Sequence, residues 1–205
     1  MKDLTFYTNP LSRGRIVRWM LEEVGEPYDA VLLDFASTMK DASYLAMNPM
    51  GKVPVIRHGD TVVSEAAAIC AYLADAFPQN KLAPPVDQRG AYYRWLFFAA
   101  GPLEAAVTAK ALGLLAPVEK RAMAGYGTFE STMDTLEAAV AGREYVAGDR
   151  FTAADVYVGS QIGWGLMFGT IEKRQAFSDY VDRLHARPAF QRGTALDDAA
   201  MPKKT

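Results

Sequence analysis

The sequence predicts a mixed α/β domain followed by an all-α domain, and three observations support this prediction. Residues 1–78 follow the order strand, helix, strand, short helix, strand, strand, helix, which is typical of one mixed sheet with helices packed on it. Residues 79–86 combine proline and polar residues without apolar periodicity, so we expect an extended linker. Residues 87–205 show no strand alternation, which predicts a helical second domain.

The first domain begins with a strand–helix–strand unit. Leu4–Tyr7 is a β-type run, and the turn Asn9-Pro10-Leu11-Ser12 leads into a helix that we expect over residues 13–24. Gly25-Glu26-Pro27 ends that helix, because glycine accepts the left-handed conformation and proline cannot continue a helix. Tyr28–Leu33 predicts a second strand, parallel to the first because a helix lies between them.

A short helix, a hairpin and a longer helix complete this domain. We expect a short helix at Ala42–Met47 and strands at Lys52–Arg57 and Thr61–Val63. Gly59-Asp60 between the two strands predicts a tight turn, so the strands form an antiparallel pair. The helix Glu65–Phe77 follows and ends before a proline.

The helices of the second domain are predicted from apolar periodicity. Tyr92–Leu115 is apolar on most sides, with Pro102 as a kink, as expected of a helix that other helices bury. Pro117 suits the first turn of the next helix, in which four apolar residues recur at helical spacing: Phe129, Met133, Leu136 and Val140. The tail from Gly193 to Thr205 has little to bury, and we expect it to be peripheral or frayed.

The clearest helix start in the sequence is Phe151-Thr152-Ala153-Ala154-Asp155-Val156. Thr152 and Asp155 stand at the two positions of a capping box, and Phe151 and Val156 stand at those of a hydrophobic staple. Loss of such a cap typically costs ~1 kcal/mol. We interpret this motif as structural.

Composition and charge disfavour several classes of function. Of the 205 residues, 50% are hydrophobic and 22% are charged, as in ordinary globular proteins. The 22 Lys and Arg residues face 24 Asp and Glu residues, so the net charge of −2 leaves no broad basic surface for nucleic acid. Cys70 is the single cysteine, and His58 and His185 are far apart, so we expect neither a disulfide nor a metal centre.

The start of the chain and its hydropathy favour a cytoplasmic protein without a membrane partner. Met1 leads directly into the first predicted strand, without a charged leader followed by an apolar stretch. No uninterrupted apolar run reaches the length that spans a membrane.

Three segments of the first domain carry candidate functional residues. Ser12 lies where the first strand meets a helix N-terminus, so it can be the helix N-cap or part of an anion site, and the two roles are compatible. Val53 precedes Pro54, which indicates an edge-strand start or a cis bond, and an outward Val53 could pair with a peptide-like ligand. Glu65, at the next helix start, is either a dipole partner or a functional carboxylate. Cys70 is expected in the core.

These segments occur in the order of a known family, and the chain resembles a cytosolic glutathione S-transferase along nearly its whole length. The turn Asn9-Pro10-Leu11-Ser12 is similar to that of the serine-type classes, the phi-like and related bacterial members above all. The segment 48–54 (NPMGKVP) resembles the family's NPxGxVP segment, and 65–69 (EAAAI) resembles its Glu-Ser-x-Ala-Ile motif. Phe151–Asp155 matches its helical capping motif. The resemblance implies a thioredoxin-like N-terminal domain that binds glutathione and an all-α C-terminal domain that contributes the electrophile pocket.

The resemblance implies a role for each matched residue. Ser12 would donate its hydroxyl to the glutathione sulfur. Val53 would pair with the cysteinyl backbone before a cis-Pro54, and Glu65 would contact the γ-glutamyl end. The turn holds no cysteine, which disfavours the thiol-transferase classes, because these need a nucleophilic sulfur.

Some further positions complete the implied site, and others are alternatives to Ser12 as the residue that contacts the sulfur. Lys40 and Lys52 align with positions that often meet the glycyl carboxylate, and each is equally consistent with a solvated surface charge. Ala66 stands where the family has a serine. Its backbone amide can still donate to the γ-glutamyl carboxylate, but the hydroxyl contact of the serine is lost, which weakens glutathione binding by ~1 kcal/mol. Other classes use a tyrosine at the strand end or an earlier polar residue, so Tyr7 and Asn9 are alternatives to the serine.

The implied activity is transfer of small hydrophobic electrophiles to glutathione in detoxification, with peroxide reduction as a further reaction of the same thiolate. Lowering a thiol pKa of ~8.5 by about two units requires ~2.7 kcal/mol of preferential anion stabilisation. A hydroxyl donor supplies roughly 1.5–3 kcal/mol, and a helix terminus supplies up to ~1 kcal/mol. The competing hypothesis is a non-catalytic binding or regulatory protein of the same fold. The resemblance also implies a homodimer.

Overall fold

The computed structural model describes residues 3–202, which divide into two compact units. The first unit contains the chain up to Leu82 together with the residues from Arg187 onwards, and the second unit contains Ala83–Ala186. The division falls inside the expected linker at 79–86. The described residues from Arg187 onwards, however, belong to the first unit, whereas the sequence placed all of residues 87–205 in one helical domain.

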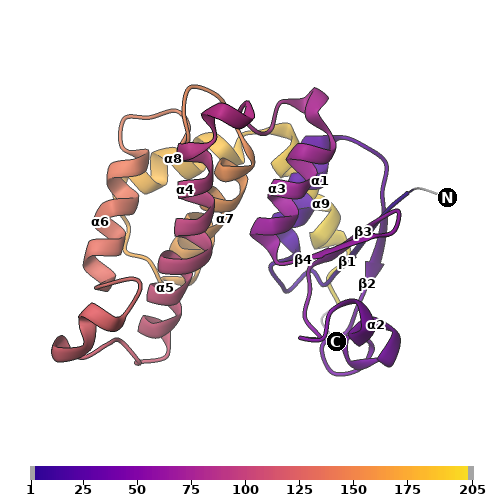
Figure 1. The fold of residues 1–205 in the computed structure, drawn as a ribbon, viewed down its shortest axis with the longest axis horizontal. Coiled ribbons are helices and arrows are strands. Elements are labelled where there is room, and N and C mark those ends of the chain that lie inside the picture. Colours follow the sequence, from indigo (N-terminus) through magenta and orange to yellow (C-terminus); the bar gives the residue numbers. More distant parts are fainter. Residues whose placement is uncertain (1–2, 203–205) are drawn as a thin grey trace. The chain divides into compact units, whose positions relative to one another are not determined.

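A mixed sheet forms the centre of the first unit, with the strand order β2-β1-β3-β4 (Figure 1). Its strands are β1 (Leu4–Thr8), β2 (Asp29–Leu32), β3 (Val55–His58) and β4 (Thr61–Ser64). β1 pairs in parallel with β2 and antiparallel with β3, and β3 and β4 form the expected hairpin. The predicted mixed sheet is confirmed, although β3 starts after Pro54 because a proline cannot donate to the ladder.

Helices cover one face of the sheet and a small apolar cluster covers the other. α1 (Gly14–Val24) and α3 (Ala66–Ala76) pack against each other and against the sheet. Alternate residues of β1 are fully buried on this face: Leu4, Phe6 and Thr8. On the other face, Tyr7 packs against a cluster formed by Met39, Tyr44 and Val55. The first two come from a 3-10 turn (Thr38–Lys40) and from α2 (Ala42–Met47).

The last helix of the chain, α9 (Pro188–Ala199), packs along α1 in the first unit. Gly193 is buried there, and a Cβ at this position would lie 3.3 Å from the backbone of Trp19, so glycine permits the close approach of the two helices. The expectation of a frayed tail is therefore wrong as far as Ala199. The end of that tail, residues 203–205, lies outside the described residues.

The second unit is helical throughout its regular elements, as predicted. Its α-helices are α4 (Gly90–Phe98), α5 (Glu104–Ala111), α6 (Phe129–Val140), α7 (Ala153–Phe168) and α8 (Gln175–His185). Pro102 lies in a π-helical segment, Ala99–Leu103, which joins α4 to α5 and accommodates the missing amide donor. No helix in the described residues is both long and apolar enough to cross a bilayer.

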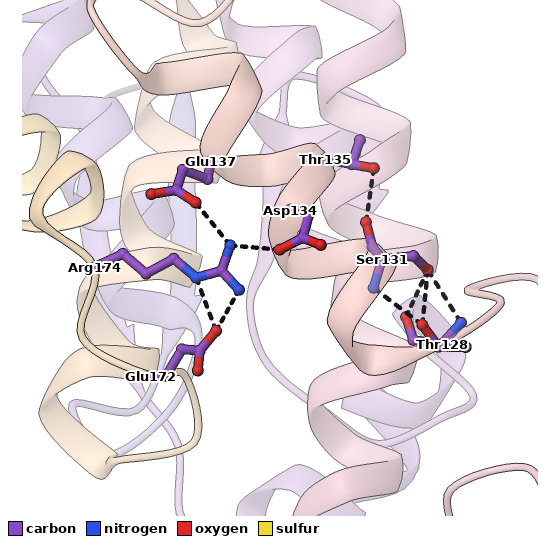
Figure 2. A network of polar contacts seen from close by, with 7 residues as sticks. All are labelled: Thr128, Ser131, Asp134, Thr135, Glu137, Glu172 and Arg174. Carbon is purple, nitrogen blue, oxygen red and sulfur yellow. Dashed lines mark hydrogen bonds and ion pairs between the residues drawn. The ribbon is translucent and has the colours of Figure 1, made fainter.

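Two capping boxes start helices of the second unit. The predicted box of Thr152 and Asp155 is confirmed at α7, where the amide of Thr152 donates to the Asp155 carboxylate at 2.9 Å. α6 is capped by Thr128 and Ser131, which Figure 2 shows. The expectation that Pro117 opens this helix is wrong, because Pro117 precedes a separate 3-10 segment and α6 begins only at Phe129.

Arg174 connects the segment before α8 to α6 by ion pairs (Figure 2). Its guanidinium donates to Asp134 and to Glu137 of α6, each at 2.8 Å, and also pairs with Glu172. The arginine is mostly covered, whereas its three carboxylate partners are more exposed. The cluster fixes the entry into α8 from the surface of the unit.

Candidate functional site

The register of the sheet brings the three candidate segments to one end of the first unit. Tyr7 of β1 is paired with Val55 of β3, and Val55 is paired with Ser64 of β4. The turn after β1, the loop before β3 and the chain after β4 therefore leave the sheet at the same edge. Segments separated by up to about fifty residues in sequence are adjacent because neighbouring strands lie ~4.8 Å apart.

Asn9 builds the turn between β1 and α1. Its side-chain oxygen accepts from the amide of Leu11 at 2.9 Å, which is an Asx turn, and its side-chain amide donates to the carbonyl of Leu33 at 2.8 Å. Its carbonyl accepts from the amide of Ser12 at 3.1 Å. Both polar ends of the Asn9 side chain are thus used to shape the turn.

Ser12 is half-buried at the start of α1, with its hydroxyl in two hydrogen bonds. Oγ accepts from the amide of Gly14 at 2.9 Å and donates to the carbonyl of Asn9 at 2.7 Å. The hydroxyl therefore satisfies an amide at the helix start, although the N-cap position itself is Arg13. The amide that donates to Oγ polarises the hydroxyl, which makes its proton a better donor to an anion.

Gly14 is required at the first position of α1 by close packing. A Cβ on this residue would lie 2.0 Å from Oγ1 of Thr8 and 3.0 Å from Oγ of Ser12. Any larger side chain would displace the end of β1 or the serine. The turn is therefore held tightly between the strand and the helix.

Tyr7 is directed away from the helix-covered face. Its ring lies 5.9 Å from the ring of Tyr44, centroid to centroid, and packs against the apolar cluster on the opposite sheet face. The side chain of the neighbouring Phe6 faces α1, where the guanidinium of Arg18 lies 5.0 Å from its ring. The two residues alternate across the sheet, as successive strand residues do.

The Val53–Pro54 peptide bond is cis, as the sequence suggested. Pro54 is buried, and Val53 lies before β3, outside the paired register. The preceding carbonyl, that of Lys52, accepts from the hydroxyl of Tyr44 at 2.6 Å and from the side-chain amide of Asn48 at 2.8 Å. The loop is anchored from one side, which leaves the Val53 backbone outside the sheet ladder.

The two candidate lysines differ in their contacts. Lys40 is exposed, and its Nζ donates to the carbonyl of Gly51 at 2.9 Å, one residue before the exposed Lys52. Gly51 has φ of 57°, and a Cβ there would lie 2.9 Å from the Lys40 ammonium. Lys40 is therefore held beside the loop, with further N–H donors available to a ligand.

Glu65 precedes α3 with a φ of 69°, a conformation that residues other than glycine rarely adopt. The side chain is exposed, and the carbonyl accepts the first backbone bond of α3, from the amide of Ile69 at 2.9 Å. Ala66 is the first residue of that helix and is buried. Its amide belongs to the helix start, where backbone donors have no partner within the helix.

Sequence reasoning missed two residues that shape the site. Asn48, which stands in the quoted NPxGxVP segment, anchors the loop before Val53 and could have been singled out from its Asn-Pro turn signal. Arg15 donates from Nε to the carbonyl of Pro10 at 2.6 Å, and no local signal identifies that contact. Cys70 is fully buried in α3 as expected, and burial raises the pKa of its thiol.

The site contains no recognisable set of metal ligands. Among residues 3–202, no group of three or more His, Cys, Asp or Glu side chains is arranged to hold a metal ion. The polar groups that the site does offer are backbone amides and carbonyls, one hydroxyl, one carboxylate and two ammonium groups. Such a set suits a zwitterionic peptide with an anionic centre.

The chain is similar to proteins of one family over much of its length. Residues 13–76 match the family model of the glutathione S-transferase N-terminal domain. The chain is 27% identical over 209 residues to glutathione S-transferase hmp2 of Hypomyces subiculosus, covering 94% of this chain and 98% of that protein. A glutathione transferase structure from Methylococcus capsulatus is similar with a TM-score of 0.78 at 27% identity, covering 96% of this chain and 99% of the other.

A further solved structure includes the ligand. A glutathione transferase homologue from Sulfitobacter, determined with bound glutathione, has a TM-score of 0.76 at 25% identity and covers 98% of this chain and 100% of the other. Together the matches confirm the predicted fold, a thioredoxin-like N-terminal domain and a helical C-terminal domain. They support a glutathione S-transferase family for the chain, and they do not distinguish the serine-type, phi-like subclass from others.

Proposed function

We propose that the protein is a glutathione S-transferase whose glutathione site lies at the edge of the sheet formed by the ends of β1, β3 and β4. The observation that carries this proposal is the convergence of the Ser12 turn, the cis-Pro54 loop and the start of α3 at that edge. An extended tripeptide spans about 10 Å. Three adjacent strands also span about 10 Å, so one tripeptide can reach all three segments.

The relatives support transferase activity rather than a non-catalytic binding protein. The curated relative and the solved structures described above are named glutathione transferases, and one of them binds glutathione. The replacement of the family serine by Ala66 is the sequence feature that favours the non-catalytic alternative. Since Ala66 keeps its place at the first turn of α3, its amide is still available to a carboxylate.

In this proposal Ser12 donates its hydroxyl to the glutathione sulfur and stabilises the thiolate. The hydroxyl exchanges its present acceptor, the carbonyl of Asn9, for the sulfur, while the amide of Gly14 continues to donate to Oγ. The positive end of the α1 dipole adds to the stabilisation. Two observations favour Ser12 over the alternatives Tyr7 and Asn9 as the sulfur ligand. Tyr7 packs against the cluster on the opposite face of the sheet, and both polar groups of the Asn9 side chain are used in the turn.

The remaining contacts follow the chemistry of the tripeptide. The free backbone of Val53 pairs with the cysteinyl unit, as an added strand would. The Glu65 carboxylate binds the γ-glutamyl ammonium group, and the amide of Ala66 donates to the γ-glutamyl carboxylate. Lys40 and Lys52 face the glycyl carboxylate from the loop that Lys40 already contacts.

The subclass and the assembly belong to the proposal as well. The serine in the turn supports a serine-type enzyme that is phi-like or related to the bacterial classes, acting on small hydrophobic electrophiles and reducing peroxides with the same thiolate. We further propose a cytoplasmic homodimer, as the family resemblance implies. Sedimentation that finds a 22.4 kDa species at micromolar protein would contradict the dimer.

The test is the ionisation of bound glutathione in Ser12→Ala. Loss of one hydroxyl donor to an anion removes ~1.5–3 kcal/mol, so the pKa of the bound thiol, followed by its ultraviolet absorbance, should rise by about one to two units. Ser178→Ala, which removes a hydroxyl in the second unit, is the matched control and should leave that pKa unchanged.

Two outcomes would change the proposal. If Ser12→Ala leaves the thiol pKa unchanged and Tyr7→Phe raises it, the sulfur contact belongs to the tyrosine. If calorimetry detects no binding of glutathione to the folded wild-type protein, the transferase assignment itself fails.

A further inference from the structure

The facing surfaces of α1 and α9 carry opposite charge gradients. Ion pairs join the two segments along their length: Arg15–Asp198, Arg18–Asp197, Glu22–Arg192 and Glu23–Arg187. The helices run antiparallel, so the basic start of α1 meets the acidic end of α9, and the acidic end of α1 meets the basic start of α9. The order of the pairs fixes the register of α9 along α1.

The charges of α1 run against its own dipole. An isolated helix is stabilised by acidic residues in its first turn and basic residues in its last turn, and α1 has neither. Arg15 and Arg18 instead stand near its positive end, and Glu22 and Glu23 stand near its negative end. This pattern is unfavourable for α1 alone and becomes favourable when α9 provides the partners.

Arg15 connects this interface to the turn that contains Ser12. Its Nε donates to the carbonyl of Pro10 at 2.6 Å, and its Nη2 donates to Oδ1 of Asp198 at 2.7 Å. One side chain thus bridges the backbone of the turn and the end of α9. The arginine side chain is 26% exposed and the aspartate side chain is 60% exposed.

The position of Pro10 makes this contact relevant to the hydroxyl. Pro10 follows Asn9, whose carbonyl accepts from both the amide and the hydroxyl of Ser12. A shift of the Pro10 peptide therefore moves the acceptor that orients the Ser12 side chain. Small displacements matter here, because a misplacement of about 1 Å can cost on the order of 100-fold in rate.

We propose that Arg15 is a positioning residue for the glutathione thiolate, and that α9 holds it in place through Asp198. The planar guanidinium makes both contacts at once, in two directions set by its fork. A lysine would keep the charge but could not hold the two acceptors in the same geometry. This inference rests on the proposed function, since it concerns the same thiolate.

Asp198→Asn gives the sharpest test, because two explanations predict opposite signs. If Asp198 acted on the thiolate only through its charge, then removing a negative charge from this end of α1 would lower the pKa of bound glutathione. If it acts by holding Arg15, its loss should raise that pKa, and we expect a rise of about half a unit. The substitution is at an exposed side chain, so the fold should be retained.

Arg15→Lys separates position from charge at the other end of the bridge. We expect the thiol pKa to rise by about one unit and kcat to fall about 10-fold, with a smaller change in the KM for glutathione. A purely electrostatic role predicts that the lysine variant behaves like the wild type. The matched control is Arg192→Gln, which removes an ion pair at the far end of the same interface and should leave the thiol pKa unchanged.

The results distinguish this inference from the proposed function. A wild-type protein that binds no glutathione overturns the proposed function. A wild-type protein with a lowered thiol pKa, together with Arg15→Lys and Asp198→Asn variants that show the same pKa or a lower one, overturns only the positioning role. A rise in Arg192→Gln equal to that in Asp198→Asn also overturns it, because the effect would then be a general loosening of the two helices.

Discussion

Asp155 in α7 and Asp197 in α9 are both completely buried, but the two carboxylates are held in different ways. Each is 0% exposed. Asp155 accepts hydrogen bonds from neutral groups in its own unit, whereas Asp197 faces the guanidinium of Arg18. Asp155 thus organises neutral donors, whereas Asp197 is half of an ion pair.

Both oxygens of Asp155 are used. Oδ2 accepts from the amide and the hydroxyl of Thr152 at 2.9 and 3.1 Å, and Oδ1 accepts from the amide of Val146 at 2.8 Å and the hydroxyl of Tyr180 at 2.7 Å. Burial raises the pKa of Asp155, and these hydrogen bonds oppose that rise. The carboxylate joins a loop, a helix start and α8 at one point.

Asp197 is satisfied on one side only. Oδ1 accepts from Nε of Arg18 at 3.2 Å, while Oδ2 has no hydrogen-bond partner among the described residues. Burial raises the pKa of this carboxyl, against the charge of Arg18, and the unpaired oxygen is consistent with that direction. Arg18 also donates to the hydroxyl of Tyr28 at 2.9 Å and lies over its ring. Buried hydrogen-bond donors need Asp155 as their acceptor, whereas the buried Asp197 carboxylate needs the Arg18 guanidinium to balance its charge.

The largest effect is expected from Asp155→Ala. This substitution leaves the amides of Val146 and Thr152 and the hydroxyl of Tyr180 buried without their acceptor, so the free energy of unfolding should fall by about 4 kcal/mol. Urea unfolding measures the loss. Asp155→Asn keeps one acceptor oxygen and should lose less. A loss below about 1 kcal/mol in the alanine variant would show that water replaces the carboxylate.

The next effect is expected from Arg18→Met. The methionine leaves the buried Asp197 carboxylate without a cation, which should destabilise the first unit by about 3 kcal/mol. The double variant Arg18→Met/Asp197→Leu should recover most of that loss, because apolar side chains of similar volume often replace a buried ion pair without penalty. A double-mutant cycle in urea gives the coupling. If the double variant is less stable than both single variants, the contrast with Asp155 disappears.

The pH dependence of stability should separate wild type from Asp197→Asn. The pKa of Asp197 is higher in the folded protein than its ordinary value of 3.8, so the folded state binds this proton more readily than the unfolded state does. The stability that the carboxyl contributes is therefore present below that ordinary value and is lost as pH rises through the folded pKa. The wild type should gain stability relative to the variant as pH falls from about 7 toward 4.

Urea midpoints of both proteins across this pH range provide the measurement. The Asp197→Asn variant is the reference for the wild type, because all other titrating groups are the same in the two proteins. A difference that shrinks as the solution is acidified would mean that Arg18 lowers the pKa of the carboxyl below its ordinary value.

The smallest effects concern the two capping boxes. Thr152 is 1% exposed and its hydroxyl contacts Asp155, whereas Thr128 is half-buried and pairs with the exposed Ser131. We expect Thr152→Ala to cost about 2 kcal/mol and Thr128→Ala about 0.5 kcal/mol, measured by thermal unfolding. Equal losses would show that burial of the cap beside Asp155 adds nothing to its strength.

Some of these contacts could be predicted because their partners are close in sequence. The spacing of Thr152 and Asp155 predicted the capping box at α7. Tyr180, which lies 25 positions from Asp155, could not be predicted, because nothing in the chain between them determines which turn of α8 faces the carboxylate. Arg18 and Asp197 are 179 positions apart, and Asp197 lies in the tail that was expected to be peripheral or frayed, so the sequence did not predict their ion pair.

The candidate site shows the same limit. The Asn9–Ser12 turn, the Val53–Pro54 bond and Glu65 were each identified from local residue types, and the cis bond is confirmed. Their meeting at one edge depends on the pairing of Tyr7 with Val55 and of Val55 with Ser64. The contact of Arg15 with the Pro10 carbonyl needs the finished turn, so no sequence pattern could reveal it.

The sequence by itself determined the elements, because turn residues, helical periodicity and caps act over a few neighbouring residues. It thereby predicted the mixed sheet and the helical second unit, and the resemblance of its motifs to a known family implied the residues that we propose bind glutathione. Only the tertiary structure decided that the last helix returns to the first unit, because the charges on α1 and α9 acquire their partners only when segments from opposite ends of the chain come together.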